Sequence, residues 1–171
     1  AFFDFALETG EDEPIEAARG LLATAVSLAD KAGNVPLWWI SNLCRHLIDD
    51  LWQHSLHRNL PTEPPAGTEG QYPDLRRLFI GSLYARKTSE IELWPSQREA
   101  ARRSTDVTDD LVVALPTSAG KTRVAEIAAL MTLSSARRVL IVTPLRALSA
   151  QTERSFRKTF APLGFSVSSL Y

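Results

Sequence analysis

The sequence predicts an α/β protein in which a helical N-terminal region is followed by a parallel β-sheet covered by helices. Up to about residue 90, apolar residues recur at three- and four-residue steps, as they do on one face of a helix. Beyond that point, continuous apolar stretches alternate with helical patterns, which is typical of strands buried between helices. We therefore expect a helical accessory region at residues 1–90 and an α/β domain at residues 91–171.

Three helices are expected in the first region, after a poorly packed lead-in at residues 1–12. The first runs from Pro14 to about Lys31, and its buried stripe comprises Ile15, Ala18, Leu22, Val26 and Ala29. The second runs from about Pro36 to His57, and the residues expected on its buried stripe are Ile40, Cys44, Leu47 and Leu51. Trp38 and Trp39 are expected in helix–helix contacts. The third runs from about Asp74 to Lys87, after a loop rich in Pro and Gly at residues 59–73.

The second region begins with a short helix near Ser96, for which Ser96 is a plausible cap with Glu99 at the reciprocal position. Strands are expected at "LVVAL" (111–115) and "RVLIVT" (138–143). Helices follow each of them, from Lys121 to about Leu133 and from about Leu145 to Thr159. The alternation of strand and helix is the basis for predicting a parallel sheet.

The composition is that of a globular protein, with 44% apolar and 23% charged residues. The sequence has no apolar run of membrane-spanning length and no signal-peptide pattern. A single cysteine, Cys44, excludes an internal disulfide and suits a reducing compartment, so the cytoplasm is the expected location. The sequence does not begin with Met, which suggests part of a longer protein.

The two regions differ in charge. Residues 1–90 carry 8 Lys and Arg against 13 Asp and Glu, a net charge of −5, whereas residues 91–171 carry 11 against 7, a net charge of +4. A basic region suits a polyanionic partner. On charge alone, however, chance and a solvated surface are the favoured interpretation.

The residues "LPTSAGKT" (115–122) suggest a phosphate-binding loop. Such a loop needs backbone N–H groups that face the phosphates, a lysine that reaches them and a hydroxyl that binds Mg²⁺. Lys121 and Thr122 supply the last two, directly before a helix whose N-terminus favours anions. Thr117, Ser118 and Ala119 are small enough for a close backbone approach, and Gly120 is the loop's single glycine. The alternative is a strand-turn-helix with a surface lysine.

Two flanking stretches, "ELWPSQREA" (92–100) and "LIVTPLRALSAQ" (140–151), extend this pattern. Together with "PTSAGKT" they resemble the Q motif, motif I (Walker A) and motif Ia of superfamily 2 DEAD/DEAH-box helicases, most closely those of the Ski-type branch. The resemblance covers about residues 91–171. It implies that this region is the N-terminal part of a RecA-like P-loop domain.

The resemblance also implies roles in binding ATP. Gln97 would read the adenine edge, and Leu93 and Trp94 would lie near the base. Residues 117 to 120 would hold phosphate through backbone N–H groups, while Lys121 would contact the terminal phosphates and Thr122 the nucleotide-bound Mg²⁺. Without the resemblance, Gln97 could equally be a surface residue of an amphipathic helix.

Nucleic-acid contacts are implied at Pro144, Arg146 and Gln151, mainly to the sugar-phosphate backbone. Arg146 could instead solvate the start of a helix. The acidic DExH box and the second RecA-like domain of the family have no counterpart in these 171 residues, so we expect little ATP hydrolysis by this segment alone.

The expected function is that of an ATP-dependent helicase or translocase acting on nucleic acid, with DNA favoured over RNA, in a setting such as prokaryotic antiphage defence. One alternative is a translocase that moves on duplex without unwinding it. Another is an interaction module in which residues 1–90 recruit a protein partner and the core acts as a nucleotide-regulated clamp. A kinase or GTPase is disfavoured because neither accounts for "PSQ" and "PLRAL" in this order.

Overall fold

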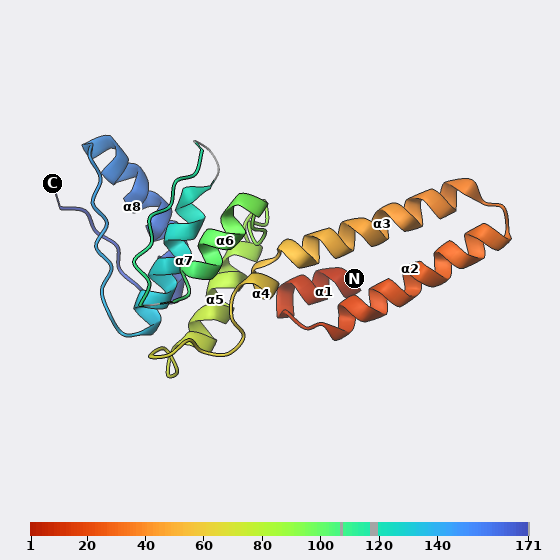
Figure 1. The fold of residues 1–171 in the computed structure, drawn as a ribbon, viewed down its shortest axis with the longest axis horizontal. Coiled ribbons are helices and arrows are strands. Elements are labelled where there is room, and N and C mark those ends of the chain that lie inside the picture. Colours follow the sequence, from red (N-terminus) through yellow and green to blue (C-terminus); the bar gives the residue numbers. More distant parts are fainter. Residues whose placement is uncertain (107, 117–119, 171) are drawn as a thin grey trace. The chain divides into compact units, whose positions relative to one another are not determined.

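The computed structural model describes residues 1–106, 108–116 and 120–170, and it divides into two compact units, Ala1–Arg58 and Asn59–Tyr171 (Figure 1). The predicted boundary between two domains after residue 90 stays a prediction. In the structure, the segment between residues 59 and 90 belongs by its contacts to the second unit.

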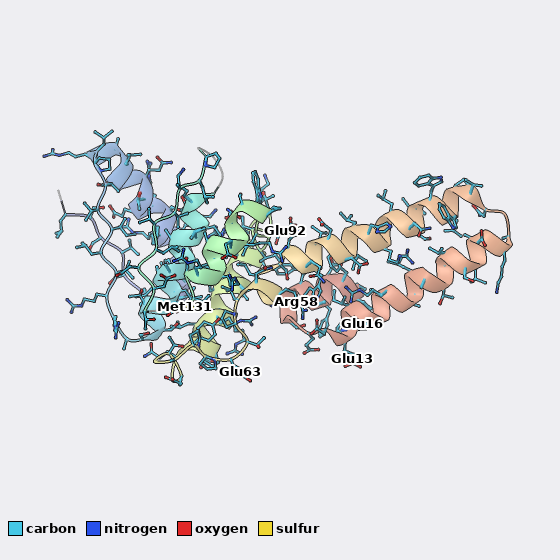
Figure 2. The ribbon with its side chains drawn as sticks, in the orientation of Figure 1. Glu13, Glu16, Arg58, Glu63, Glu92 and Met131 are labelled. Carbon is cyan, nitrogen blue, oxygen red and sulfur yellow. The ribbon has the colours of Figure 1, made fainter. Side chains whose placement is uncertain are left out.

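The first unit is built on a long helical hairpin formed by α2 (Glu13–Lys31) and α3 (Val35–His54) (Figure 1). Its tight turn is compatible with the sequence because Gly33 takes a positive φ of 62°, and Asn34 caps α3 by accepting a hydrogen bond from the Leu37 N–H at 3.1 Å. Glu13 and Glu16 project from the first turns of α2, where negative charge complements the helix dipole (Figure 2). The predicted boundaries of this helix are confirmed within one residue.

The lead-in predicted at residues 1–12 is wrong, because Phe2–Thr9 forms a helix, α1. Ala6 on α1 is fully buried with Ile15 and Trp52 in a small apolar cluster. The Nε2 of His57, in the short helix α4 (Leu56–Asn59), lies 2.8 Å from a carbonyl oxygen of α1. Tertiary contacts therefore order a segment whose own sequence shows little helical periodicity.

The predicted stripe on α3 is only partly correct. Ile40 and Leu47 are more than half exposed, and the buried α3 residues are Ser41 and Trp52. Trp38 and Trp39 are 36% and 65% exposed, so neither lies in the core, and their rings contact each other on the same helix with centroids 5.6 Å apart. The face of α3 that α2 covers is thus rotated away from its most apolar residues.

The second unit is a cluster of helices. These are α5 (Tyr72–Tyr84), α6 (Pro95–Arg103), α7 (Lys121–Ser134), α8 (Arg146–Phe160) and a short 3₁₀ turn, η1 (Ala161–Leu163). Phe79 of α5 and Phe160 of α8 are both buried, with ring centroids 6.1 Å apart. Met131 on α7 is buried among these helices (Figure 2). The predicted spans of α7 and α8 are confirmed within one residue.

The predicted parallel sheet is wrong: the described residues contain no β-strand. Exposure alternates along residues 111–116 and 139–142, as it does in an extended chain, whose successive side chains point to opposite sides. They are not buried on both faces, because Val112, Leu140 and Val142 are 94%, 85% and 84% exposed. The second unit is therefore helical with extended connections, and it is not an α/β sheet domain.

Among the described residues, no helix is long and apolar enough to cross a membrane.

Candidate nucleotide site

A pocket of about 500 Å³ opens beside the first turn of α7 in the second unit. Four of the residues predicted to bind nucleotide line it, namely Trp94, Gln97, Gly120 and Thr122. The rest of the lining is mostly charged or polar and comprises Arg86, Ser89, Glu90, Glu92, Arg123, Glu126, Ser155 and Lys158. The structure thus brings two separate sequence motifs, at residues 92–100 and 115–122, to one cavity.

Gln97 connects the two motifs directly. Its Oε1 accepts a hydrogen bond from the Trp94 N–H at 2.7 Å, and its Nε2 donates to the Gly120 carbonyl oxygen at 3.0 Å. The residue is only 5% exposed, so the surface-residue alternative is wrong. These bonds use one acceptor position and one N–H, and a carboxamide has two of each. Gln97 can therefore hold the loop and still pair with a ligand.

The start of α6 shows why Gln97 is fixed in this position. Trp94 occupies the cap position and α6 begins at Pro95, so the predicted cap at Ser96 is wrong. Gln97 is the third helical residue, and its side chain reaches back to the cap N–H as in half of a capping box. Leu93 is fully buried, whereas Trp94 is more than half exposed at the pocket lining. Only Trp94 of this pair is placed to meet a ligand.

The loop before α7 is described at its two ends. Thr117, Ser118 and Ala119 lie outside the described residues. Gly120 takes a φ of 71°, and a Cβ there would lie 1.9 Å from Nε2 of Gln97, so both the backbone and the neighbour require glycine.

The two residues predicted to meet phosphate and Mg²⁺ are exposed at the start of α7. The Lys121 ammonium donates to the carbonyl oxygens of Leu115 and Pro116 at 2.5 and 3.1 Å. Lys121 is not part of the pocket lining, whereas Thr122 is. A bound phosphate would therefore have to draw the ammonium away from the loop carbonyls.

The residues predicted to contact nucleic acid, Pro144, Arg146 and Gln151, are all exposed at or near the start of α8. Gln151 and Arg146 lie more than one turn apart on the same helix. They are accessible, as backbone contact requires, and they do not line the pocket.

The sequence analysis missed a closed ring of side chains at the pocket, which we call the ring. Its members are Arg86, Glu90, Arg123, Glu126 and Thr159. Arg86 donates to Glu90 and, at 2.9 Å, to the Thr159 hydroxyl, which donates to Glu126 at 2.7 Å. Arg123 closes the ring by donating to Glu126 at 2.7 Å and to Glu90 at 2.9 Å. The three-residue spacing of Arg123 and Glu126 on α7 was a local signal for one side of it.

The Glu90 carboxylate contacts three cationic side chains. These are Arg86, Arg123 and Lys158, whose ammonium lies 3.3 Å from its Oε1. Burial acts to raise the pKa of Glu90, but the hydrogen bond and charge of Arg86, followed by those of Lys158, outweigh it. The pKa of Glu90 therefore lies below its ordinary value, and the carboxylate is ionised at neutral pH.

Because the folded-state pKa of Glu90 is lowered, its ionisation stabilises the folded state above the unfolded pKa of about 4.3. This contribution is lost as pH falls through the folded value. We expect Glu90→Gln to lower the Tm of the full-length protein near pH 7, and the difference from wild type to shrink as the pH is lowered below about 4.3. Thermal unfolding followed from pH 3 to pH 8 measures this, and a difference that grows toward acid would contradict it.

Residues 94–171 match the family model of DEAD/DEAH box helicases. This part of the chain is helicase-like in sequence. Over 167 residues, 96% of the chain, it is 29% identical to the Hachiman protein HamB of Bacillus cereus, of which it covers 14%. Over 50 residues, 29% of the chain, it is 54% identical to the DExH-box ATP-dependent RNA helicase DExH15 of Arabidopsis thaliana, covering 4% of that protein.

The resemblance to helicases is confirmed at this level. The assignments of Q motif, motif I and motif Ia stay predictions. The assignment to the Ski-type branch stays a prediction. The chain spans only a small part of each relative, and HamB is matched across both structural units.

Proposed function

We propose that this chain is part of an ATP-dependent helicase or translocase that couples ATP hydrolysis to movement on a nucleic-acid strand. The observation that carries the proposal is the hydrogen bond from Gln97 to Gly120 beside the pocket. It joins the two motifs that helicases use for the base and for the phosphates, in a segment that matches the helicase family. A chance Gly-Lys-Thr sequence would not account for this convergence.

The site's chemistry fits ATP with Mg²⁺. The pocket volume of about 500 Å³ lies within the range of small-molecule sites. Gln97 retains donor and acceptor capacity for an adenine edge, Trp94 offers an aromatic surface, and Thr122 presents a hydroxyl at the lining. Bound ATP with Mg²⁺ would supply the phosphoryl group whose transfer to water drives movement.

The residues of this chain would bind and orient the nucleotide. Lys121 would exchange its two carbonyl partners for phosphate oxygens, and Thr122 would present its hydroxyl to the metal-bound nucleotide. Pro144, Arg146 and Gln151 would contact the sugar-phosphate backbone of the strand, which accounts for binding without sequence preference.

The proposal is tested by ATP hydrolysis with the full-length protein in the presence of no polymer, single-stranded DNA, single-stranded RNA or duplex DNA. Strong stimulation by one polymer is expected, with single-stranded DNA favoured over RNA. A strand-displacement assay on the stimulating polymer then separates unwinding from translocation on duplex. Turnover that no polymer stimulates would overturn the motor proposal.

Gln97→Ala is expected to weaken the preference for ATP over GTP, because it removes the carboxamide that would pair with the adenine edge. It also removes the tie to Gly120, so binding of both nucleotides should fall. The measurement is the ratio of kcat/KM values for ATP and GTP, which cancels the shared loss. An unchanged ratio would mean that Gln97 does not read the base.

We infer that the biological setting is prokaryotic antiphage defence in the cytoplasm, which is supported by the similarity to a bacterial Hachiman protein across 96% of the chain. Phage-challenge assays with the gene and its Lys121→Ala variant test this setting. Equal plaque counts with and without the wild-type gene, across phages that its host encounters, would speak against it.

A second candidate function is recruitment of a protein partner by the hairpin of α2 and α3. On α3, large apolar residues recur every four positions and are all more than half exposed: Val35, Trp39, Leu43 and Leu47. Residues four apart share one face of a helix, so these side chains form an apolar stripe. Such a stripe suits the apolar face of a partner helix.

Recruitment is tested with the double variant Trp39→Ser and Leu43→Ser in the full-length protein. Proteins that copurify with the wild-type protein are isolated first. The affinity of each for the wild-type protein and for the double variant is then measured directly. We expect a partner that binds the wild-type protein at least about tenfold more tightly than it binds the double variant, because a buried aromatic side chain contributes this much to binding. Leu78→Ser, at an exposed leucine of α5, is the matched control. Equal affinities would exclude the stripe as the docking surface.

A further inference from the structure

The ring has properties that surface ion pairs lack. The side chains of Arg86 and Arg123 are each 11% exposed, that of Glu126 is 4% exposed, and Thr159 is fully buried. Every bond in the ring involves a charged group, and such bonds are strong where water is excluded, as it is at every member except Glu90, whose side chain is 38% exposed. A closed network of this kind constrains the backbone segments that carry its members.

Those segments are three. Arg86 and Glu90 follow α5, Arg123 and Glu126 lie in the first two turns of α7, and Thr159 lies near the end of α8. Arg123 is the residue directly after Thr122. The ring therefore fastens the turn of α7 that carries the nucleotide-binding residues to two neighbouring parts of the unit.

We propose that the ring positions the first turn of α7, so that Lys121 and Thr122 keep the geometry that nucleotide binding needs. The inference rests on the proposed nucleotide site. Arg123 is the central member, because its two terminal nitrogens bind two different carboxylates, Glu90 and Glu126. Because both terminal nitrogens of this planar guanidinium are held, Arg123 restricts the orientation of α7 more than a single ion pair would.

Gln97 and the ring hold the chain on either side of Lys121 and Thr122. Gln97 binds the carbonyl oxygen of Gly120, the residue before α7, and Arg123 is held three residues later. Lys121 and Thr122 are the two residues between these fixed points. Neither the ring nor Gln97 needs to touch the phosphates in order to set their binding geometry, so the ring residues are positioning residues.

Thr159→Val opens the ring by removing two hydrogen bonds, those of the hydroxyl with Arg86 and with Glu126, with almost no change in side-chain volume. In the full-length protein, we expect the Kd for ATP with Mg²⁺ to rise about tenfold, the lower end of what loss of a supporting partner costs at a bound-ion site. The Kd is measured by displacement of a fluorescent ATP analogue, at a temperature at least 15 °C below the Tm, about the margin needed for a folded population. A purely structural role would lower the Tm and the active fraction and leave the Kd unchanged.

If Thr159→Val fails to fold, Glu90→Gln is a second variant that breaks the ring, at a residue whose side chain is 38% exposed. The double variant should show little further loss, because members of one network act as a unit. Glu99→Gln is the matched control, since it removes an exposed ion pair with Arg102 on α6. Wild-type Kd values in both ring variants would overturn the inference. Failure of the wild-type protein to bind ATP would instead overturn the proposed function.

Discussion

Replacing Lys121 by alanine is expected to lower kcat for ATP hydrolysis by at least about a hundredfold, the effect of deleting one donor that stabilises developing charge. Phosphoryl transfer depends mainly on positioning and electrostatic stabilisation, and Lys121 is the residue whose ammonium would reach the phosphates. Its present partners are the carbonyl oxygens of Leu115 and Pro116, which hydration can replace. We therefore expect the Tm of the variant to match that of wild type.

The measurement is steady-state ATP hydrolysis by the full-length protein with saturating stimulating polymer. Lys87→Ala is the control, because Lys87 is an exposed lysine of the same unit outside the pocket lining. Retained turnover in Lys121→Ala would show that the segment at 115–122 does not bind phosphate and that Lys121 is a surface lysine.

Gly120→Ala is expected to impair both stability and nucleotide binding. An alanine there would be held at a φ of 71°, and its Cβ would lie 1.9 Å from Nε2 of Gln97. Gln97 can move aside only by giving up its bonds to Gly120 and Trp94. We expect a loss of about 1–3 kcal/mol, in the range for a residue forced into a disfavoured backbone region.

Gly81→Ala is a closely matched control, since Gly81 lies in α5 and an added Cβ there meets no atom within 4 Å. This second variant should gain about 0.5–1 kcal/mol, the usual advantage of alanine inside a helix. Thermal unfolding and nucleotide Kd values are measured for both. Equal behaviour of the two variants would mean that the conformation at Gly120 does not matter to the site.

The course of α2, α7 and α8 could be predicted because helix formation depends on nearby residues. Apolar side chains at three- and four-residue steps act within a few residues of one another, as do the first-turn proline and the following glycine of α2. The same holds for the positions of Gly120 and Lys121 at the start of α7, while their roles stay predictions. Local sequence was sufficient for these features, which include the loop end of the candidate site.

The predicted sheet was wrong because a strand exists only through pairing with another strand. Exposure alternates along 111–116 and along 139–142, as it does in an extended chain, but neither run is a strand. Whether such segments form a ladder depends on backbone partners, and a continuous apolar run does not contain that information. The same limit applies to α3. This helix has more apolar residues than α2 covers, and the local pattern does not show which of them α2 will contact.

By itself, therefore, the sequence determined the helices that begin and end within their own few residues, and the similarity of residues 94–171 to helicases. Only the tertiary structure decided that Gln97 is buried against Gly120, that the ring joins three segments, and that the apolar runs stay unpaired. Each of these depends on contacts between residues more than twenty positions apart. Such contacts are set by how whole segments pack, because closing a long loop brings together side chains that no local pattern connects.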